Sequence, residues 1–189
     1  MARWALIAEE DGTTRTRCAR AVATQLVRAG YRVGGFVQLR RDDGDECSKV
    51  FLERLATGEE LLLASRGPGT QVLPDGTTGC HAFSTDAFVV ARTWLLEDAR
   101  HCEVLVLDAI SKLETLGRGH AEALRHALGL GREKILLVCA RASLLFEIVE
   151  TFGLLDAEDL LVAHLEAPLD EPSTQHFART LEAAIHRTG

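Results

Sequence analysis

The stretch that decides the fold is residues 4–14, WALIAEEDGTT. Its first five residues are apolar, which is typical of a strand buried on both faces of a sheet. The acidic turn at residues 9–12 ends this strand, and apolar side chains at helical spacing predict a helix over about residues 14–29. Gly30 stands where a helix is commonly capped, and residues 32–39 predict a second strand. This order predicts two parallel strands joined by a right-handed crossover.

The same alternation resumes after residue 84. Helices are predicted over residues 84–98, 119–128, 143–152 and 173–186, and strands over residues 103–107, 134–139 and 160–163. Apolar strands that alternate with amphipathic helices predict an α/β fold, a three-layer sandwich around a mainly parallel sheet. The length of 189 residues fits a single domain, residues 1–189.

Residues 40–80 interrupt this alternation and are interpreted as an insertion. Residues 40–46 are charged and predict a solvated loop, and residues 50–55 and 60–64 predict a β-hairpin. Residues 65–80 contain four glycines and two prolines, which predicts a loop without regular structure. Such a loop is either functional, as a lid or a ligand-binding segment, or simply mobile.

Composition excludes several classes of protein. The chain has 21 basic and 28 acidic residues, a net charge of −7, and no basic block, which argues against nucleic-acid binding. No run approaches the roughly 20 apolar residues of a membrane helix, and the first apolar run is too short for a secretory signal. Five scattered cysteines form no CxxC pair. These features predict a cytoplasmic protein.

Parallel sheets bind ligands at the carboxyl ends of their strands, so residues 7–14 are the first candidate site. They are in frame with the phosphate-binding pattern GxxxxGK[ST], which Gly12 and Thr14 match. Thr13 stands in place of the lysine, and three consecutive carboxylates would repel a triphosphate. Arg15 or Arg17 could supply positive charge. The alternative interpretation is an ordinary acidic turn with a threonine helix cap.

The second candidate site follows the predicted strand at residues 103–107. Asp108 comes after four apolar residues, the arrangement of a Walker B motif, whose carboxylate holds a magnesium-bound water. Lys112 and Glu114 are candidates to line the same cleft, and with Asp108 they are the candidate catalytic residues. If the two strands are neighbours, the acidic residues 9–11 would converge with Asp108 on magnesium. The alternative is a solvent-facing aspartate followed by an exposed charge pair.

These segments resemble a known family. VLVLDAISKLE at residues 104–114 resembles the hhhhDEIGKME segment of the thermophile-type nucleoside triphosphatases, which are P-loop proteins that hydrolyse nucleotides. GGFVQ at residues 34–38 and LATGE at residues 55–59 are similar to the second strand and the hairpin of that family. The likeness extends over about residues 3–150. It is closer to an uncharacterised bacterial branch with a degenerate phosphate loop, in which GKxExxGxG is typical.

The resemblance implies a nucleotide or anion site with magnesium as its companion ion. The candidate residues of this site are Gly12, Thr13 and Thr14 of the phosphate-loop frame, Arg15 beside them, and Arg141, which falls where that family often has an arginine. It also suggests a link to molybdenum metabolism, which no residue of the chain supports.

Departures from the family pattern argue against hydrolysis. Thr13 replaces the lysine, and Ala109 replaces the glutamate that polarises the attacking water. Both changes remove electrostatic stabilisation of phosphoryl transfer. The sequence therefore predicts a regulatory or accessory module with weak or lost nucleotide binding.

Two alternative functions stay open. In the first, the chain is an active phosphohydrolase in which Lys112 and an arginine such as Arg15 or Arg141 replace the usual groups. In the second, it binds a protein partner, or a second copy of itself, through the hairpin and residues 65–80.

Overall fold

The computed structural model describes the chain except for residues 43–47, 73–77, 155–159, 167–169 and 187–189, and it leaves out the side chains of residues 42, 48, 66–72 and 78–81 as well. The strands are β1 (Arg3–Ala8), β2 (Val33–Asp42), β3 (Ser48–Arg54), β4 (Glu60–Val72), β5 (Thr78–Phe83), β6 (Val104–Ile110), β7 (Ile135–Ala140) and β8 (Leu161–Glu166). The helices are α1 (Gly12–Arg28), α2 (Thr85–Asp98), α3 (Lys112–Thr115), α4 (Ala121–Leu128), α5 (Leu145–Thr151) and α6 (Glu171–His186), with a 3₁₀ turn, η1 (Ala142–Leu144).

The strands form one sheet in the order β5-β4-β3-β2-β6-β7-β1-β8. The five strands from β2 to β8 in this order are parallel, and β3, β4 and β5 extend the sheet as antiparallel strands. The predicted mainly parallel sheet with an inserted hairpin is therefore confirmed. One expectation is wrong: β1 and β6 are not neighbours, because β7 pairs with both of them.

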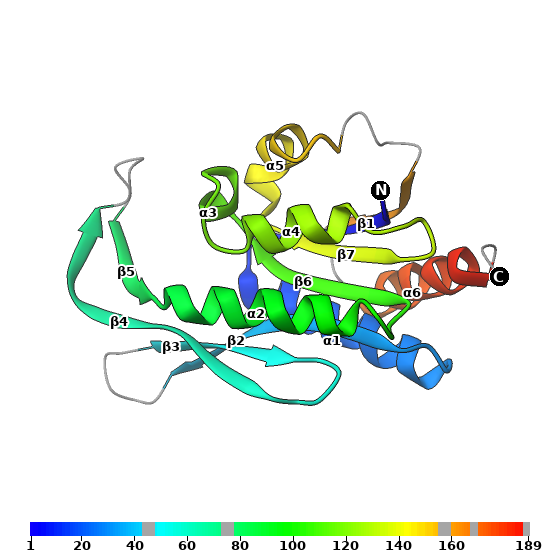
Figure 1. Cartoon of the computed structure of the whole chain (residues 1–189), viewed down its shortest axis with the longest axis horizontal. Coiled ribbons are helices and arrows are strands. Elements are labelled where there is room, and N and C mark those ends of the chain that lie inside the picture. The colour runs from blue at the N-terminus through cyan, green and yellow to red at the C-terminus, as the bar shows by residue number, and fades with distance from the viewer. Residues whose placement is uncertain (43–47, 73–77, 155–159, 167–169, 187–189) are drawn as a thin grey trace.

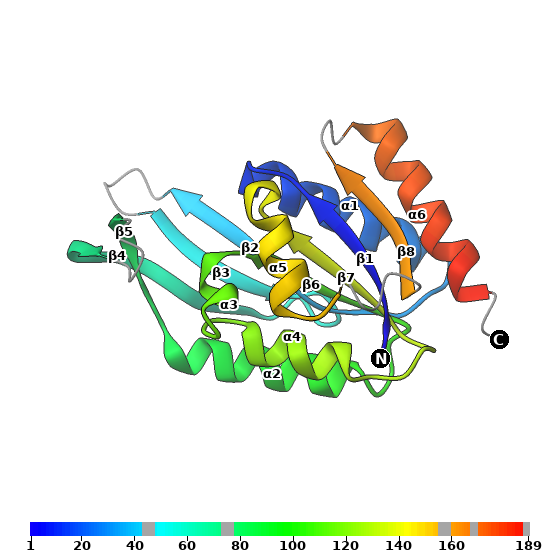
Figure 2. The same ribbon diagram turned by 90° about the horizontal axis from the view of Figure 1, so that it is seen from above.

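Helices cover both faces of the sheet, as Figures 1 and 2 show. Successive side chains of a strand point to opposite faces. Trp4 and Leu6 pack in the core beneath α2 and α4, and Ala5 and Ile7 pack in the core beneath α1 and α6. The parallel strands are thus buried on both sides, which explains their continuous apolar runs. The predicted three layers are confirmed.

Close backbone contact between β2 and β6 explains the GGFVQ segment. Gly35 has a φ of +84°, and a Cβ atom at this position would lie 2.1 Å from the carbonyl oxygen of Val106. Its N–H donates to the buried carboxylate of Asp98 at 2.9 Å, and Arg54 of β3 donates to the same carboxylate at 2.5 Å. The glycine is therefore required for the contact between the strands.

The predicted loop at residues 65–80 is wrong where the structure describes it. Residues 65–72 belong to β4 and residues 78–80 to β5, and these strands pair antiparallel. Residues 64–66 and 71–72 of β4 pair with β5, and the register shifts between Arg66 and Gln71. This pairing satisfies backbone groups that an isolated loop would leave to solvent. The ribbon extends away from the helices in Figure 1. Residues 73–77 lie outside the described residues.

Smaller differences concern the ends of elements. Residues 40–42 continue β2 and are not part of a loop, while residues 43–46 of that predicted loop are outside the described part. The short helix α3 was not expected. Among the described residues, no helix is long and apolar enough to cross a membrane.

Candidate functional site

A cavity of about 690 Å³ lies at the carboxyl ends of β2 and β6, beside the start of α1. This volume is in the range of small-molecule sites. Five arginines line it, Arg15, Arg17, Arg20, Arg40 and Arg141, together with the acidic residues Glu10, Asp11 and Glu114. The cavity is therefore where the sequence predicted the site, and its lining is rich in positive charge.

The start of α1 is closed by its own cap, Asp11. The carboxylate of Asp11 accepts hydrogen bonds from the backbone N–H of Thr13 at 3.3 Å and of Thr14 at 3.0 Å, and from the Thr14 hydroxyl at 2.6 Å. The bonds from Thr14 are the main cause of the lowered pKa of Asp11. The cap is thus Asp11 and not a threonine, and the amides that would hold a phosphate already bind a carboxylate.

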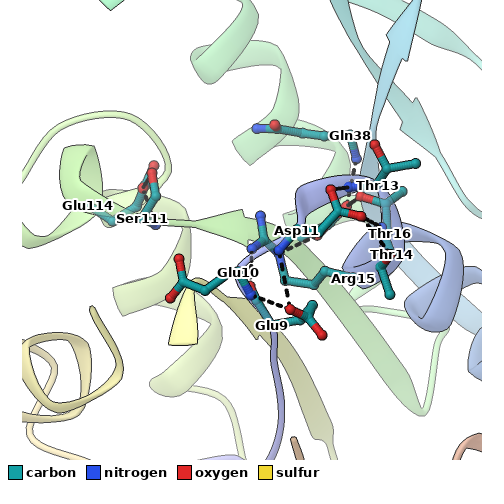
Figure 3. Close-up of polar contacts among 11 residues, drawn as sticks. Glu9, Glu10, Asp11, Thr13, Thr14, Arg15, Thr16, Gln38, Ser111 and Glu114 are labelled. Carbon is teal, nitrogen blue, oxygen red and sulfur yellow. Dashed lines mark hydrogen bonds and ion pairs between the residues drawn. The ribbon is translucent and has the colours of Figure 1, made fainter. Parts of the chain in front are cut away.

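The loop between β1 and α1 holds the protein's own guanidinium group. Arg15 is buried, and its Nη1 donates to the carbonyl oxygen of Glu9 at 2.8 Å (Figure 3). A phosphate-binding loop directs N–H groups towards the ligand, whereas this loop directs a carbonyl oxygen towards a cation. Arg15 is therefore committed to contacts within the protein, although part of it still lines the cavity.

Asp108 is the other partner of Arg15. Its side chain is completely buried in β6, and its Oδ1 lies 3.6 Å from Nε of Arg15. Its Oδ2 accepts hydrogen bonds from the Thr16 hydroxyl and from the backbone N–H of Gln38 at 3.0 Å. Burial raises the pKa of Asp108, while Arg15, Thr16 and Gln38 favour the ionised form. These contacts join α1, β2 and β6 at one point.

The expected convergence of four carboxylates does not occur. Glu9 accepts hydrogen bonds from the backbone N–H groups of Glu10 and Asp11, and Asp108 faces Arg15. Within the described residues, no group of three or more histidine, cysteine or acidic side chains could hold a metal ion. Because the oxygens of Asp108 already face Arg15, Thr16 and Gln38, this carboxylate does not fit a magnesium site.

Arg141 lies at the cavity, as the resemblance implied. Its Nε is 3.8 Å from Oε2 of Glu10, and both side chains are about half exposed. The other oxygen of Glu10 accepts a hydrogen bond from the backbone N–H of Ser143. Hydrogen bonding to Ser143, from its side chain first and from its backbone second, lowers the pKa of Glu10. An exposed ion pair contributes little free energy, so an anionic ligand could replace Glu10 at Arg141.

Glu114 holds a loop together. It is 2% exposed and accepts hydrogen bonds from the backbone N–H of Ser111 at 2.8 Å and of His120 at 2.9 Å. Gly119 has a φ of +58°, and a Cβ atom there would lie 2.3 Å from Oε1 of Glu114. Burial raises the pKa of Glu114 against these hydrogen bonds. Glu114 and Gly119 of the SKLETLGRG segment therefore stabilise the loop between β6 and α4.

Of four other predicted site residues, two line the cavity and two do not. Lys112 does not line the cavity; its Nζ donates to Glu147 of α5 at 2.9 Å, so the expectation that it lines the cleft is wrong. Thr14 does not line it either, whereas Gly12 and Thr13 do.

Ala109 has an unusual backbone conformation. Its φ is +64°, and the pairing of β6 with β7 changes register around it. A left-handed conformation costs an alanine roughly 1–2 kcal/mol. Ala109 lines the cavity at the position for which the resemblance implies a glutamate, so this part of the wall carries a methyl group.

Sequence reasoning missed Thr16, Gln38 and His120. Thr16 could have been found, because it is a polar residue on the inward stripe of α1. Gln38 contributes its backbone N–H, and no side-chain pattern reports that. The proposed partner-binding segment, residues 65–80, consists mostly of residues whose side chains are not described.

Two solved structures are similar to the whole chain. THEP1 from the hyperthermophile Aquifex aeolicus aligns with a TM-score of 0.57 at 14% identity, covering 99% of this chain and 100% of that one. A human cancer-related nucleoside triphosphatase aligns with a TM-score of 0.64 at 17% identity, covering 99% of each chain. The chain therefore shares its α/β fold with these two proteins.

The family follows from the sequence. Residues 4–147 match the family described as "Protein of unknown function (DUF2478)", and the chain belongs to it. The chain is also 33% identical over 114 residues to Molybdenum import ATP-binding protein ModC 2 of Bradyrhizobium diazoefficiens. That match covers 58% of this chain and spans 12% of the length of the relative.

Proposed function

We propose that this chain is a binding module that holds an anionic small molecule of the nucleotide class in its arginine-lined cavity and does not hydrolyse it efficiently. The observation that carries the proposal is that side chains of the protein itself occupy the β1–α1 loop. Its first-turn amides bind Asp11, and its interior is occupied by the guanidinium of Arg15. Nucleotide binding agrees with the names of the similar proteins, two of which are nucleoside triphosphatases or ATP-binding proteins.

Anion binding would rest on side chains at the open part of the cavity. Arg17 and Arg40 line it without an ion-pair partner among the side chains that the structure describes, and Arg141 has only an exposed one. Guanidinium groups form paired hydrogen bonds with phosphate oxygens. The proposed site therefore uses arginine side chains in place of loop amides.

Hydrolysis lacks the groups that it requires. Thr13 carries no charge, Asp108 is paired with Arg15, and Ala109 cannot orient water. Loss of one such stabilising group typically costs about 10²- to 10³-fold in rate. Magnesium would enter only as a counter-ion of the ligand, because Asp108 is occupied. This combination favours a regulatory or accessory role over a catalytic one.

Titration calorimetry with ATP and GTP, each with and without magnesium, tests binding. We expect saturable binding that weakens by about three- to tenfold in Arg40→Gln and in Arg141→Gln, as the loss of one charged hydrogen bond would give. Arg179→Gln, at an exposed position of α6, is the matched control and should leave the affinity unchanged. A flat calorimetric trace for all nucleotides would refute binding.

Phosphate release by the same samples tests the absence of hydrolysis. Release at the rate of a working nucleotidase would instead support the active phosphohydrolase.

A second candidate ligand is a tetrahedral oxyanion. It is favoured by the 33% identity over 114 residues to a molybdenum import ATP-binding protein. Arginine side chains bind a tetrahedral dianion as readily as a phosphate. Titration with molybdate, with sulfate as the control, distinguishes the oxyanion from the nucleotide. Molybdate binding that ATP does not displace would favour the oxyanion as the ligand.

A further inference from the structure

His120 is a buried polar side chain without a polar partner. It precedes α4, is 1% exposed, and neither Nδ1 nor Nε2 has a hydrogen-bond partner among the described residues. Burial lowers the pKa of His120 to about 3, so the imidazole is neutral at physiological pH. A neutral imidazole has one hydrogen-bond donor and one acceptor. Burying both without a partner lowers the stability of the folded protein, and buried polar groups in proteins are rarely left unpaired.

Aromatic side chains connect His120 to the cavity. Its ring centroid lies 4.6 Å from that of Phe36 and 4.7 Å from that of Phe88, which meets it edge to face at 78°. Phe88 also packs against Phe83, with centroids 6.0 Å apart and planes at 26°. Phe83 and Phe88 both line the cavity. The four rings therefore form a row that runs from the cavity into the core.

The alternation of β2 places this row at the inner end of the cavity. Phe36, Gln38 and Arg40 share one face of the strand because they are two residues apart. Phe36 is fully buried against His120, whereas Gln38 and Arg40 line the cavity. Phe88 lines the cavity and contacts His120, whereas His120 itself does not line it, so the ring of Phe88 lies between the cavity and the imidazole.

We propose that the inner end of the cavity binds a flat nitrogen heterocycle of the nucleobase class, which takes the place of Phe88 against His120. The ring nitrogens of His120 then hydrogen-bond the heteroatoms of the ligand, and its phosphate lies towards Arg40. A hydrocarbon ring would leave the imidazole unpaired, so this arrangement selects nitrogen-bearing rings. The phosphate part of this inference rests on the proposed function, and the ring part does not.

The test compares ring-bearing ligands with a ring-free one. Adenosine, guanosine, cytidine, uridine, their 5′-monophosphates and ribose 5-phosphate are titrated into the wild type, His120→Phe and His126→Phe. His126 is an exposed residue of α4, which makes the last variant a matched control. We expect at least one monophosphate to bind about tenfold more tightly than ribose 5-phosphate, because one additional net hydrogen bond changes the affinity by about that factor. His120→Phe should abolish this preference and leave ribose 5-phosphate unchanged.

Different failures have different meanings. If His120→Phe keeps the preference, or if ribose 5-phosphate binds as well as every monophosphate, the heterocycle site is refuted while anion binding stands. If nucleosides bind through His120 but no phosphate adds affinity, the proposed function fails and the heterocycle site stands. If no probe binds, both fail. Ring ¹⁵N shifts of His120 in the wild type should move at saturation with the preferred monophosphate; unchanged shifts would refute the contact whatever the variant does.

Discussion

Nε of Arg15 lies 3.6 Å from Oδ1 of Asp108, and the two side chains are 7% and 0% exposed. The two atoms face each other as a buried ion pair without a hydrogen bond between them. The pair joins the first turn of α1 to the central strand β6. It therefore places a positive charge of the protein where the loop of a nucleoside triphosphatase would enclose a phosphate.

Replacing Asp108 by alanine should destabilise the protein strongly. The guanidinium of Arg15 would stay buried without a counter-charge, and breaking a buried pair in this way typically costs about 3–5 kcal/mol. Urea denaturation of Asp108→Ala, Arg15→Met and the double variant gives the coupling between them. The double variant should be less destabilised than the sum of the single ones. Additive effects would contradict the pairing.

Asp11→Ala should destabilise α1 and also free its first-turn amides. Asp11 accepts three hydrogen bonds at this helix start, whereas Ser84 accepts one at the start of α2. Loss of a helix cap destabilises a protein, and we expect Asp11→Ala to lower the melting temperature more than Ser84→Ala does. Thermal unfolding measures both.

The affinity of Asp11→Ala for ATP is the second measurement on this variant. It should exceed that of the wild type, because the amides of Thr13 and Thr14 become available and one negative charge is removed. Lower affinity would show that Asp11 supports the ligand and does not compete with it.

His120→Phe should make stability less dependent on pH. The pKa of His120 is lowered from 6.5 to about 3 in the folded protein, so between these values the unfolded chain binds a proton that the folded one does not. The wild type therefore loses stability as the pH falls below 6.5, by at most about 1.4 kcal/mol per pH unit from this residue. The variant lacks this loss.

Urea denaturation at pH 7 and pH 5 measures the effect of His120→Phe. At pH 7 the variant should also gain about 1 kcal/mol, because two unpaired buried nitrogens are removed. His126→Phe is the control, since that side chain is exposed. Parallel pH profiles for the wild type and His120→Phe would contradict the burial of a neutral imidazole.

Gly35→Ala and Gly58→Ala separate close packing from backbone conformation. Both glycines have positive φ, +84° and +74°, but only at Gly35 would a Cβ atom meet another backbone, that of Val106. Gly58→Ala should cost about 1–2 kcal/mol, the price of a left-handed alanine. Gly35→Ala should cost distinctly more, because β2 must move away from β6. Equal losses in denaturant melts would contradict the close approach.

The regular part of the fold was predictable because its signals are local. Residues 4–8 are a continuous apolar run, and Ser84 caps α2 as its sequence predicts, by accepting from the N–H of Ala87. The β4–β5 ribbon was not predictable, because its glycines and prolines favour a loop and only pairing between the two strands overrides them.

The site was predictable in place but not in its contacts. Gly12 and Arg141 line the cavity as expected. The partners of Asp108 are 92 residues away at Thr16 and 70 residues away at Gln38, and no spacing rule connects them. Arg15 was expected to serve an anion, and only the folded chain reveals its contact with Asp108.

Amide and arginine signals in ¹⁵N–¹H spectra, recorded during titration with ATP and magnesium, test the central claim most directly. The claim is that arginine side chains of the cavity, and not the β1–α1 loop, bind the phosphates. We predict saturable shifts of the Nε–H signals of Arg40 and Arg141, with the amides of Thr13 and Thr14 unmoved. Saturable shifts of those two amides, with the arginine signals unmoved, would contradict it.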